Sequence, residues 1–432
     1  MPRRNLLWLI LASLVCVICY QKVQSNRYGR LLGDTLDHVS RRYFEPVDNL
    51  SLFQSAMKGM MGSLDKNSAY IAPAQKKQFD ELVTREFGGV GMEVTLDQKT
   101  KQLTVISPMV GSPAYEAGIQ AGDKVLKIEG RTTQGMSLED AVELMHGTPG
   151  TPVSLSVLHE GQSQPVEIKI LRRIIQADTV LGDTRNANGS WDFFLAGRNR
   201  VGYLRLTSFA EAERSDSGVK TTVADLHAAL EWLSGRNLRG LILDLRDNPG
   251  GSLRAAVDVC DMFIPSGVIV TTRGREGRIV RTHSASGKGQ YTDFPMAVLV
   301  NENSASASEI VAACLQDHHR AVIVGRRSYG KGTVQEVSDL GEQCGELKLT
   351  VATYWRPSGR NIHRGASSKD GAWGVMPDDG YDVPLAAAEQ TQLHLARQHR
   401  DIALPAAADG GPTPFVDRQL ARAVEYVDKA AR

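Results

Sequence analysis

The sequence predicts a multidomain protein with an α/β core, a smaller, mostly β domain inserted ahead of that core, and helical segments at both ends. Its 432 residues suffice for two to four domains of roughly 100–200 residues each. Strand-like and helix-like patterns alternate over residues 200–355, which favours an α/β layer. Short strand-like pieces separated by Gly and Pro cover residues 87–173, with one helical stretch among them.

Composition narrows the classes of function before any motif is considered. Apolar residues make up 42% and charged residues 23% of the chain, so sizeable cores can form and the chain is not predominantly disordered. Lys and Arg number 50 against 49 Asp and Glu, a net charge of +1, which excludes a bulk basic nucleic-acid binder and an acidic solvating protein. Two of the five cysteines lie in an apolar N-terminal run, and the other three are scattered without a C-x-x-C pair, so no disulfide framework or zinc site is evident.

The first 25 residues have the pattern of an export signal. Two arginines precede residues 6–20, a run without a charge whose length suits a signal-peptide h-region or a short signal anchor better than a full membrane span. Val23 and Ser25 offer a small-residue cleavage pattern, and a buried core helix is the alternative. We expect residues 1–25 to be a signal peptide or anchor and the rest of the chain to lie outside the cytoplasm.

Residues 26–86 are predicted to form a helical N-terminal region. Apolar residues recur at near-helical spacing between Leu31 and Tyr43, and a second stretch carries Met57, Met60 and Met61. We interpret these methionines as core filler rather than as a binding surface.

A glycine-rich motif opens the β region at Phe87. Its glycines allow successive backbone N–H groups to point into one pocket, which suits a carboxylate, and a following strand edge can pair with an extended peptide. An ordinary glycine-rich turn is the alternative. The candidate carboxylate-binding residues are Gly88, Gly89, Val90 and Gly91.

The segment that follows this motif resembles a PDZ domain. The resemblance implies that residues 87–173 form such a domain and that its glycine loop captures a protein C-terminus. It rests on Gly111-Ser112-Pro113-Ala114, Ala117-Gly118, Ala121-Gly122-Asp123 and Val125-Leu126-Lys127-Ile128, in that order.

The α/β region contains five strand candidates, which alternate with three helix candidates. The helix expected at 220–234 carries one apolar face and is followed by Gly235, and further helices follow Ser252 and Ser306. The strand candidates are residues 201–206, 241–245, 297–300, 321–324 and 347–352.

The second of these strands ends in Asp247-Asn248-Pro249-Gly250-Gly251. Backbone N–H groups at such a turn can form an oxyanion or phosphate cradle, and a plain strand-to-helix turn is the alternative. The chain has no G-x-x-x-x-G-K-[ST] motif, which counts against a P-loop phosphate site.

Small residues fill the segment from Asn301 to Glu309. They place a hydroxyl at a helix N-terminus, where the helix dipole favours negative charge that develops on oxygen. The alternative is structural: the serines act as N-caps, with Glu309 completing a capping box to Ser306.

Lys331 lies between Gly330 and Gly332. A lysine acts as a general base only where burial lowers its pKa from about 10.4 toward the working pH. Gln335 lies four residues further on, which in an extended segment puts both side chains on one face, so that the amide can orient the ammonium. A flexible surface turn with a solvated lysine is the alternative.

Taken together, the motifs resemble the C-terminal processing peptidases, or tail-specific proteases, of the S41 serine peptidase family. The resemblance runs from about residue 31 to residue 384, in the family's order. Two departures are visible: Lys66-Asn67 replaces Pro-His, and Asp247 stands where Asn is common. The further motifs are Leu64-Asp65-Lys66-Asn67-Ser68-Ala69-Tyr70, Gly202-Tyr203-Leu204-Arg205-Leu206, Ser208-Phe209 and Pro357-Ser358-Gly359-Arg360.

This resemblance implies roles for individual residues. Ser306 matches the nucleophile, Lys331 the general base and Gln335 the residue that orients the lysine. The backbone N–H of Ala307, with one from Gly250-Gly251, would form the oxyanion hole. Asp317 would give structural support. The implied reaction is acyl transfer to serine and then to water, which needs no metal, nucleotide or other cofactor.

The resemblance also implies an organisation and a setting. Residues 174–385 would form an α/β protease core of the crotonase/ClpP-like type, and residues 386–432 a linker and a C-terminal helix. The protein would act in the periplasm or cell envelope, with residues 6–20 as an anchor if they are retained. Its partners would be polypeptides with free C-termini and further copies bound through the helical ends, not nucleic acid. The alternative is a catalytically silent PDZ scaffold or ligand-binding protein on the same fold.

Overall fold

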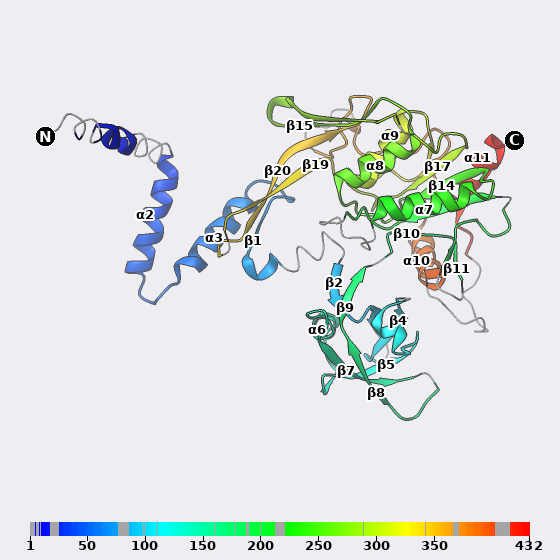
Figure 1. Ribbon diagram of the computed structural model, residues 1–432, viewed down its shortest axis with the longest axis horizontal. Coiled ribbons are helices and arrows are strands. Elements are labelled where there is room, and N and C mark those ends of the chain that lie inside the picture. Colours follow the sequence, from blue (N-terminus) through cyan, green and yellow to red (C-terminus); the bar gives the residue numbers. More distant parts are fainter. Residues whose placement is uncertain are drawn as a thin grey trace. The chain divides into compact units, whose positions relative to one another are not determined.

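The structure is a computed structural model of the chain, shown in Figure 1. It falls into two compact units, one formed by Met1–Lys77 and Gln335–Thr350, the other by Gln78–Val334 and Val351–Arg432. The described residues are 5, 8, 10–17, 26–76, 86–97, 100–109, 111–159, 161–176, 178–186, 190–198, 200–211, 221–287, 289–341, 343–365, 371–401 and 415–432.

The first unit is helical with a short sheet. Helices α2 (Arg27–Arg42) and α3 (Asn49–Gly62) precede strand β1 (Ala69–Ile71), which pairs antiparallel with the start of β20 (Glu346–Trp355). Each helix begins at a polar cap, because the side chains of Asn26 and Asp48 accept N–H groups of the first turn. Met57 and Met61 are buried against Tyr70, so the interpretation of the methionines as core filler is confirmed for these two, whereas Met60 is exposed.

The export pattern lies only partly within the described residues. Residues 10–17 are helical, and residues 18–25, which include the cleavage pattern at Val23 and Ser25, lie outside them. Within the described residues, no helix combines the length and the apolar character that a membrane crossing needs.

A β-rich region folds around its own apolar core, with Leu103, Val125 and Leu155 fully buried. Its main sheet has the order β3-β4-β5-β7-β8, β6 pairs with β5, and β2 pairs with β9. Helix α6 begins at Ser137, whose side chain accepts the N–H of Asp140. The elements are β2 (Glu86–Gly89), β3 (Met92–Leu96), β4 (Leu103–Pro108), α5 (Pro113–Glu116), β5 (Lys124–Ile128), β6 (Arg131–Thr132), α6 (Leu138–Met145), β7 (Pro152–Leu158), β8 (Val166–Leu171) and β9 (Arg173–Gln176).

The α/β region contains a five-stranded sheet in the order β10-β13-β14-β17-β18, in which all strands but β10 run parallel. Leu241 and Leu243 of β14 pack in the cluster that includes α7, α8 and α9, whereas Ile242 packs with Val424 and Val427 of α11. Both faces of the sheet are therefore covered, as parallel sheets require. The elements are β10 (Val180–Leu181), β13 (Val201–Leu206), α7 (Thr222–Ser234), β14 (Gly240–Asp244), α8 (Leu253–Phe263), β17 (Met296–Val300), α9 (Ala307–Asp317), β18 (Val322–Gly325) and α11 (Arg418–Ala430).

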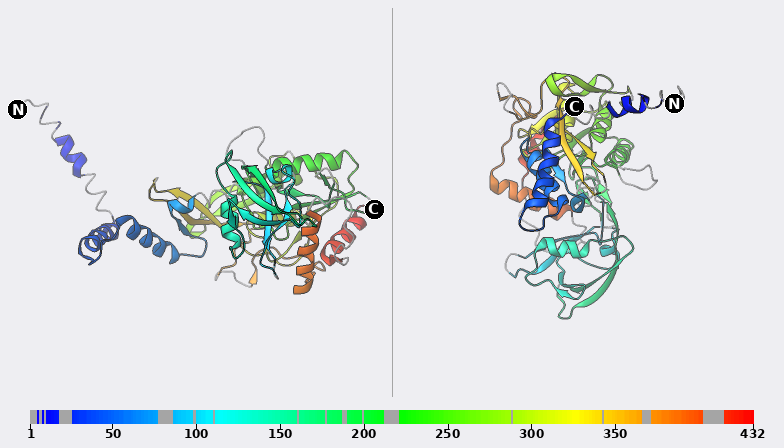
Figure 2. Two further views of the ribbon diagram at one scale, coloured as in Figure 1. Left: turned by 90° about the horizontal axis from the view of Figure 1, so that it is seen from below. Right: turned by 90° about the vertical axis from the view of Figure 1, so that its left-hand side faces the viewer.

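Smaller elements complete this region. An ion pair between Arg418 and Glu389 at 2.8 Å joins α10 and α11, the orange and red helices in Figure 2. The linker expected at residues 404–414 lies outside the described residues. The remaining elements are β11 (Thr184–Arg185), β12 (Trp191–Asp192), β15 (Val268–Arg273), η1 (Arg275–Gly277), β16 (Ile279–Ser284), β19 (Thr333–Asp339) and α10 (Ala387–Asp401).

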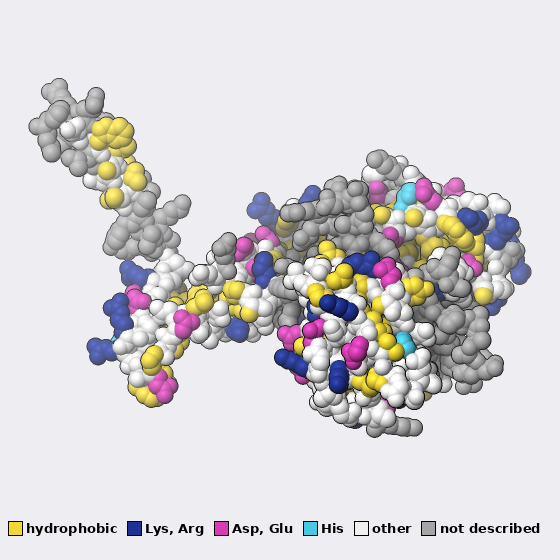
Figure 3. Space-filling view, turned by 60° about the horizontal axis from the view of Figure 1, so that its bottom comes forward, with side chains coloured by type: hydrophobic (Ala, Val, Ile, Leu, Met, Phe, Trp, Pro, Cys, Tyr) yellow, Lys and Arg dark blue, Asp and Glu magenta, His cyan; other side chains and the backbone are white. Residues whose placement is uncertain are grey.

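The expected fold class, an α/β core with a β-rich domain and helical ends, is confirmed. The strand expected at 201–206 coincides with β13. Those expected at 241–245 and 321–324 shift by one residue to give β14 and β18, and the one expected at 297–300 begins one residue earlier as β17. The segment expected at 347–352 lies within β20, which belongs to a different sheet from the parallel strands. Charged side chains of both signs are interspersed over the face in Figure 3, as the balanced composition suggests.

Candidate active site

Ser306 stands at the point where β17 has ended and α9 is about to begin. Its backbone has φ 56° and ψ −113°, a conformation that costs a residue with a side chain about 1–3 kcal/mol. The neighbouring serines are buried and hold the loop in place, because Ser304 Oγ donates to Leu245 O over 2.8 Å and Ser308 Oγ donates to Asn248 O over 2.9 Å. Of these three serines, only Ser306 is partly exposed.

The Gly250-Gly251 turn packs directly against Ser306. Gly250 has φ 104°, and a Cβ atom there would lie 2.8 Å from Ser306 Cβ and 3.0 Å from Ala307 N. Only glycine allows this approach. The Gly250 N–H donates to Asn248 Oδ1 over 2.8 Å, so this donor is already used within the turn.

Glu309 joins the serine segment to the lysine loop. Its carboxylate is fully buried, and Oε2 accepts the backbone N–H groups of Ser306 and Lys331 over 2.9 and 2.8 Å. Oε1 accepts the Ser328 hydroxyl over 2.5 Å and the Gly330 N–H over 2.6 Å. Burial raises the pKa of Glu309, although these hydrogen bonds oppose the shift. The backbones of Ser306 and Lys331 are thereby brought together around one carboxylate.

The lysine loop is not the flexible surface turn considered as the alternative. Lys331 is partly buried, and the neighbouring glycines bond to passing segments: Gly332 O accepts the Tyr354 N–H over 2.7 Å, and Gly330 O accepts the Arg364 N–H over 2.8 Å. A Cβ atom at Gly332 would lie 2.2 Å from a backbone nitrogen. Neighbouring atoms leave no room for a side chain at either position, so glycine is required on both sides of Lys331.

Gln335 lies in the first compact unit, in an ordered polar chain. Its Nε2 donates to Thr350 Oγ1 over 3.2 Å, and Thr350 Oγ1 donates to Asp65 Oδ1 over 3.2 Å. Because an ionised carboxylate only accepts hydrogen bonds, the threonine hydroxyl must donate to Asp65 and accept from Gln335. This arrangement directs the Gln335 amide nitrogen to Thr350. Asp65 and Ser68, whose Oγ accepts the Thr350 N–H over 3.1 Å, come from the segment with the Lys66-Asn67 departure.

A buried ion network supports the strand that precedes the glycine turn. Arg246 donates to Asp244 and Asp417, with shortest distances of 2.7 and 2.8 Å, and Arg397 donates to Asp244 over 2.7 Å. Burial opposes ionisation of Asp244, but the two arginines hold its pKa well below the usual range. Burial and the Asp244 charge raise the pKa of Tyr203, whose hydroxyl donates to Asp244, to about 12.

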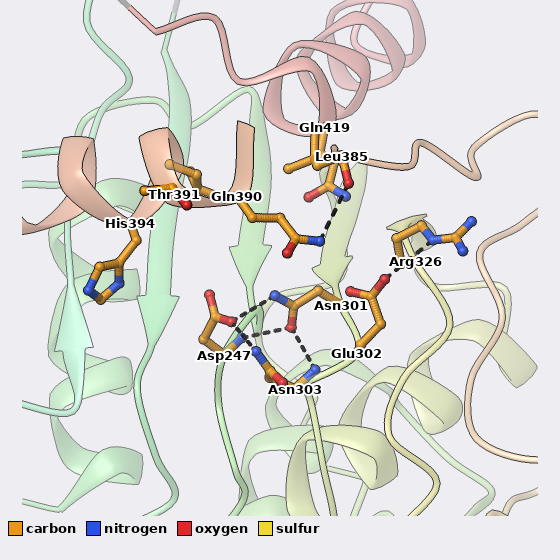
Figure 4. Close-up of a pocket in the computed structure, with 11 residues that line it drawn as sticks. Asp247, Asn301, Glu302, Asn303, Arg326, Leu385, Gln390, Thr391, His394 and Gln419 are labelled. Atoms are coloured by element: carbon orange, nitrogen blue, oxygen red, sulfur yellow. Dashed lines mark hydrogen bonds and ion pairs between the residues drawn. The ribbon is translucent and has the colours of Figure 1, made fainter. Parts of the chain in front are cut away.

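Asp247 extends this network to the edge of a polar cavity of about 610 Å³ (Figure 4). Its carboxylate accepts Arg397 Nη1 over 2.7 Å and the amides of Asn301 and Asn303 over 2.8 and 2.9 Å. Burial disfavours the charged form, but these partners hold the pKa of Asp247 below its usual value. The departure from Asn at this position thus gives Arg397 a second carboxylate.

The predicted site residues therefore fall into three groups. Ser306, Ala307, Gly250, Gly251 and Lys331 lie around α9, Gln335 lies in the other unit, and Gly88, Gly89, Val90 and Gly91 lie in the β-rich region. Asp317 accepts Arg356 Nε over 3.0 Å and the Ser358 N–H over 2.9 Å, as a supporting residue would. Sequence reasoning missed the wider role of Glu309, which it interpreted only as a cap, and it missed Arg397 altogether.

Comparison with known proteins finds two matching families and several relatives. The model of peptidase family S41 matches residues 200–378, and the PDZ domain model matches residues 104–158. A carboxy-terminal-processing protease of Bartonella bacilliformis is 37% identical over 94% of this chain and 89% of its own length. A carboxyl-terminal-processing protease of Synechocystis is 35% identical over 82% of this chain and 78% of its own.

Solved structures include a photosystem II D1 C-terminal processing protease that is 28% identical, with a TM-score of 0.46, over 82% of this chain and 92% of that one. The identity and coverage of the two sequence relatives are sufficient to place the chain. It belongs to peptidase family S41, as a serine-type carboxyl-terminal-processing protease that carries a PDZ domain.

Proposed function

We propose that the protein is an endopeptidase in which Ser306 is the nucleophile and Lys331 the general base. Ser306 Oγ attacks the carbonyl carbon of a peptide bond while Lys331 Nζ takes its proton. The tetrahedral intermediate collapses as the C–N bond breaks, and Lys331 returns the proton to the leaving amine. Water then attacks the acyl-enzyme ester, Lys331 takes a proton from it, and Ser306 Oγ recovers that proton as the ester breaks.

The observation that carries this proposal is the shared acceptor of the two residues. Ser306 and Lys331 both donate their backbone N–H to Glu309 Oε2. The backbone positions from which the two side chains project are therefore held close together by one buried carboxylate. The strained φ of Ser306 supports the same reading, since backbone strain of this kind is concentrated at functional sites.

The oxyanion would lie between Ala307 N–H and the glycine turn. Ala307 is the first residue of α9, whose initial N–H groups have no partner within the helix and carry the positive end of its dipole. Because the Gly250 N–H already binds Asn248, we favour the Gly251 N–H as the second donor. Gln335 would accept from the Lys331 ammonium through Oε1, while its Nε2 donates to Thr350.

The PDZ domain would select the substrate. In this proposal Gly88, Gly89, Val90 and Gly91 bind the C-terminal carboxylate of a polypeptide, and the bound tail adds to the neighbouring strand. The export pattern at residues 1–25 supports action in the periplasm or cell envelope, with residues 6–20 as an anchor where they are retained. Copies would associate through the helical ends.

The test compares the full chain with its Ser306→Ala variant on an unfolded protein with an apolar C-terminus, with cleavage followed by mass spectrometry. We expect Ser306→Ala to abolish cleavage, whereas Ser234→Ala, the same change at an exposed position, leaves the rate unaltered. Equal cleavage by wild type and Ser306→Ala would exclude this nucleophile. No cleavage by any of the three, together with retained binding of the tail, would favour a silent PDZ scaffold.

A further inference from the structure

Arg172, between β8 and β9, carries a buried charge that is bonded only to neutral groups. The residue is 9% exposed. Its Nε donates to Met145 O over 3.0 Å and its Nη2 to Leu144 O over 2.9 Å. Its Nη1 donates to Pro152 O over 2.7 Å and to Thr151 Oγ1 over 3.1 Å. Among the residues that the structure describes, no carboxylate forms an ion pair with this guanidinium. Arginine is almost never buried without such a partner.

The carbonyl acceptors show which part of the fold this charge meets. Leu144 and Met145 are the last two residues of α6, where unpaired carbonyl groups carry the negative end of the helix dipole. A Cβ atom at Gly147 would lie 2.8 Å from Arg172 Nε. The residue that the guanidinium passes after the helix end is therefore a glycine. Arg172 therefore converts a partly negative helix end into a positive region.

The glycine loop lies against this same helix end. The Gly147 N–H donates to Gly88 O over 2.9 Å. Strands β2 and β9 pair Gly88 with Ile174 and Gly89 with Arg173, the residue next to Arg172. The pairing ends there, because the Arg172 N–H donates to Thr151 O over 2.9 Å. The buried charge thus adjoins, through Gly147 and the end of the β2–β9 pairing, the loop that is proposed to receive a carboxylate.

We infer that Arg172 supplies the positive potential by which the loop of Gly88, Gly89, Val90 and Gly91 selects a free C-terminal carboxylate over a neutral chain end. This inference rests on the proposed function of that loop. Without Arg172, the C-terminal carbonyls of α6 would repel an incoming carboxylate. With Arg172 present, the electrostatic field at the loop favours an anion. Because the guanidinium is buried, dissolved salt screens its charge less than it would screen the charge of an exposed arginine. Arg172 is a positioning residue in this sense, because it acts through α6 and the loop.

The experiment measures binding to two pools of fluorescein-labelled decapeptides with randomised last three positions, one of free acids and the other of C-terminal amides. The protein is the full chain with Ser306→Ala, which prevents cleavage. It is compared with the same chain carrying Arg172→Met, and with a matched control, Arg173→Met. Arg173 is the neighbouring residue, half-exposed, and its charge is already paired with Glu116 over 2.8 Å.

We expect Arg172→Met to weaken binding of the acid pool roughly tenfold while binding of the amide pool stays within about twofold, so that the acid-to-amide preference collapses. Arg173→Met should keep most of the preference. If Arg172 had only a structural role, Arg172→Met would weaken binding of both pools alike. Thermal unfolding of each variant is measured first, so that binding is compared at a temperature at which all variants are folded. An unchanged acid-to-amide ratio in Arg172→Met, or a greater loss of it in Arg173→Met, would overturn the inference. If the parent chain itself binds both pools equally or neither pool, the proposed function of the loop fails instead.

Discussion

Ser306 and Lys331 donate their backbone N–H groups to the same oxygen, Oε2 of Glu309, over 2.9 and 2.8 Å. One of these residues has a strained backbone, and the other stands between two glycines. Neither would be expected to hold its position by local preference alone. The buried carboxylate therefore sets the separation of the two points from which the proposed nucleophile and base project.

Glu309→Gln tests this dependence. The substitution turns one carboxylate oxygen into an NH₂ group that faces two donors, so buried donors lose their acceptor. We expect kcat on an unfolded protein substrate to fall about 100-fold through misplacement of the reacting groups. The free energy of unfolding in urea should fall by about 1–3 kcal/mol. Glu231→Gln, the same change at an exposed position of α7, should alter neither quantity. Activity of Glu309→Gln within twofold of wild type would contradict this role.

Gly250→Ala tests the close approach of the glycine turn to the serine. The added Cβ would lie 2.8 Å from Ser306 Cβ, so the turn or the serine must move. We expect kcat/KM to fall at least about 100-fold. Gly197→Ala is the matched control, because Gly197 also has a positive φ, of 69°, but nothing lies within 4 Å of its Cβ position. Both variants bear the backbone strain of about 1 kcal/mol or more, and only the first should lose activity. Similar activity of the two variants would show that the contact has no catalytic consequence.

Thr350→Val tests whether the chain from Asp65 to Gln335 orients the amide. Valine keeps the shape of threonine but can neither donate to Asp65 nor accept from Gln335. With its amide no longer directed, Gln335 should support the lysine less well, so we expect kcat to fall about tenfold with little change in KM. Thr350→Ser retains the hydroxyl and should restore most of the rate. Failure of serine to restore it would point to packing rather than to the hydroxyl.

Asp247→Asn introduces the residue that is common in the family at this position. Arg397 then loses one of its two carboxylate partners but keeps Asp244. Because the Asp247 side chain is about half exposed, we expect a loss of only about 1 kcal/mol in the free energy of unfolding, after allowance for solvent screening. Catalytic activity should be retained.

The pH dependence of this difference has a definite sign. The folded pKa of Asp247 is depressed, so its stabilising contribution is present above the unfolded value of about 3.9 and is lost as the pH falls through the folded pKa. The stability gap between wild type and Asp247→Asn should therefore be full at pH 5 to 7 and shrink toward pH 3. Urea unfolding across this range measures it. A gap that widens on acidification would assign the effect to another group.

Sequence patterns predicted most helices and strands well, because these elements depend on local rules. Strand β13 was predicted to the residue. Glu309 was different. Its spacing from Ser306 indicates a capping interaction, and that bond forms, but the same carboxylate also binds a loop about twenty residues further on. A local spacing carries no information about that second partner.

Arg397 shows the same limit more strongly. It lies in an amphipathic helix rich in charged residues, where the default expectation is a solvated side chain. It is instead 5% exposed and pairs with Asp244, 153 residues away in the sequence. Only the packing of α10 against the strand ends brings the two charges together. Likewise, the sequence shows that residue 172 is a cation, but it does not predict that the guanidinium lies at the C-terminal end of α6.

The partners of Arg246 bear on the order in which the protein is made. Two of them, Asp417 and Gln419, follow it by 171 and 173 residues, at the far end of the chain. During synthesis, the strand that leads into the Gly250-Gly251 turn is complete long before these residues exist. Until they are added, Arg246 lacks the hydrogen bonds to Asp417 and Gln419. We therefore expect catalytic competence to arise last, once the final helix has docked. Such a delay would protect a nascent chain from an active protease. It would also make this protease vulnerable to the loss of its own tail.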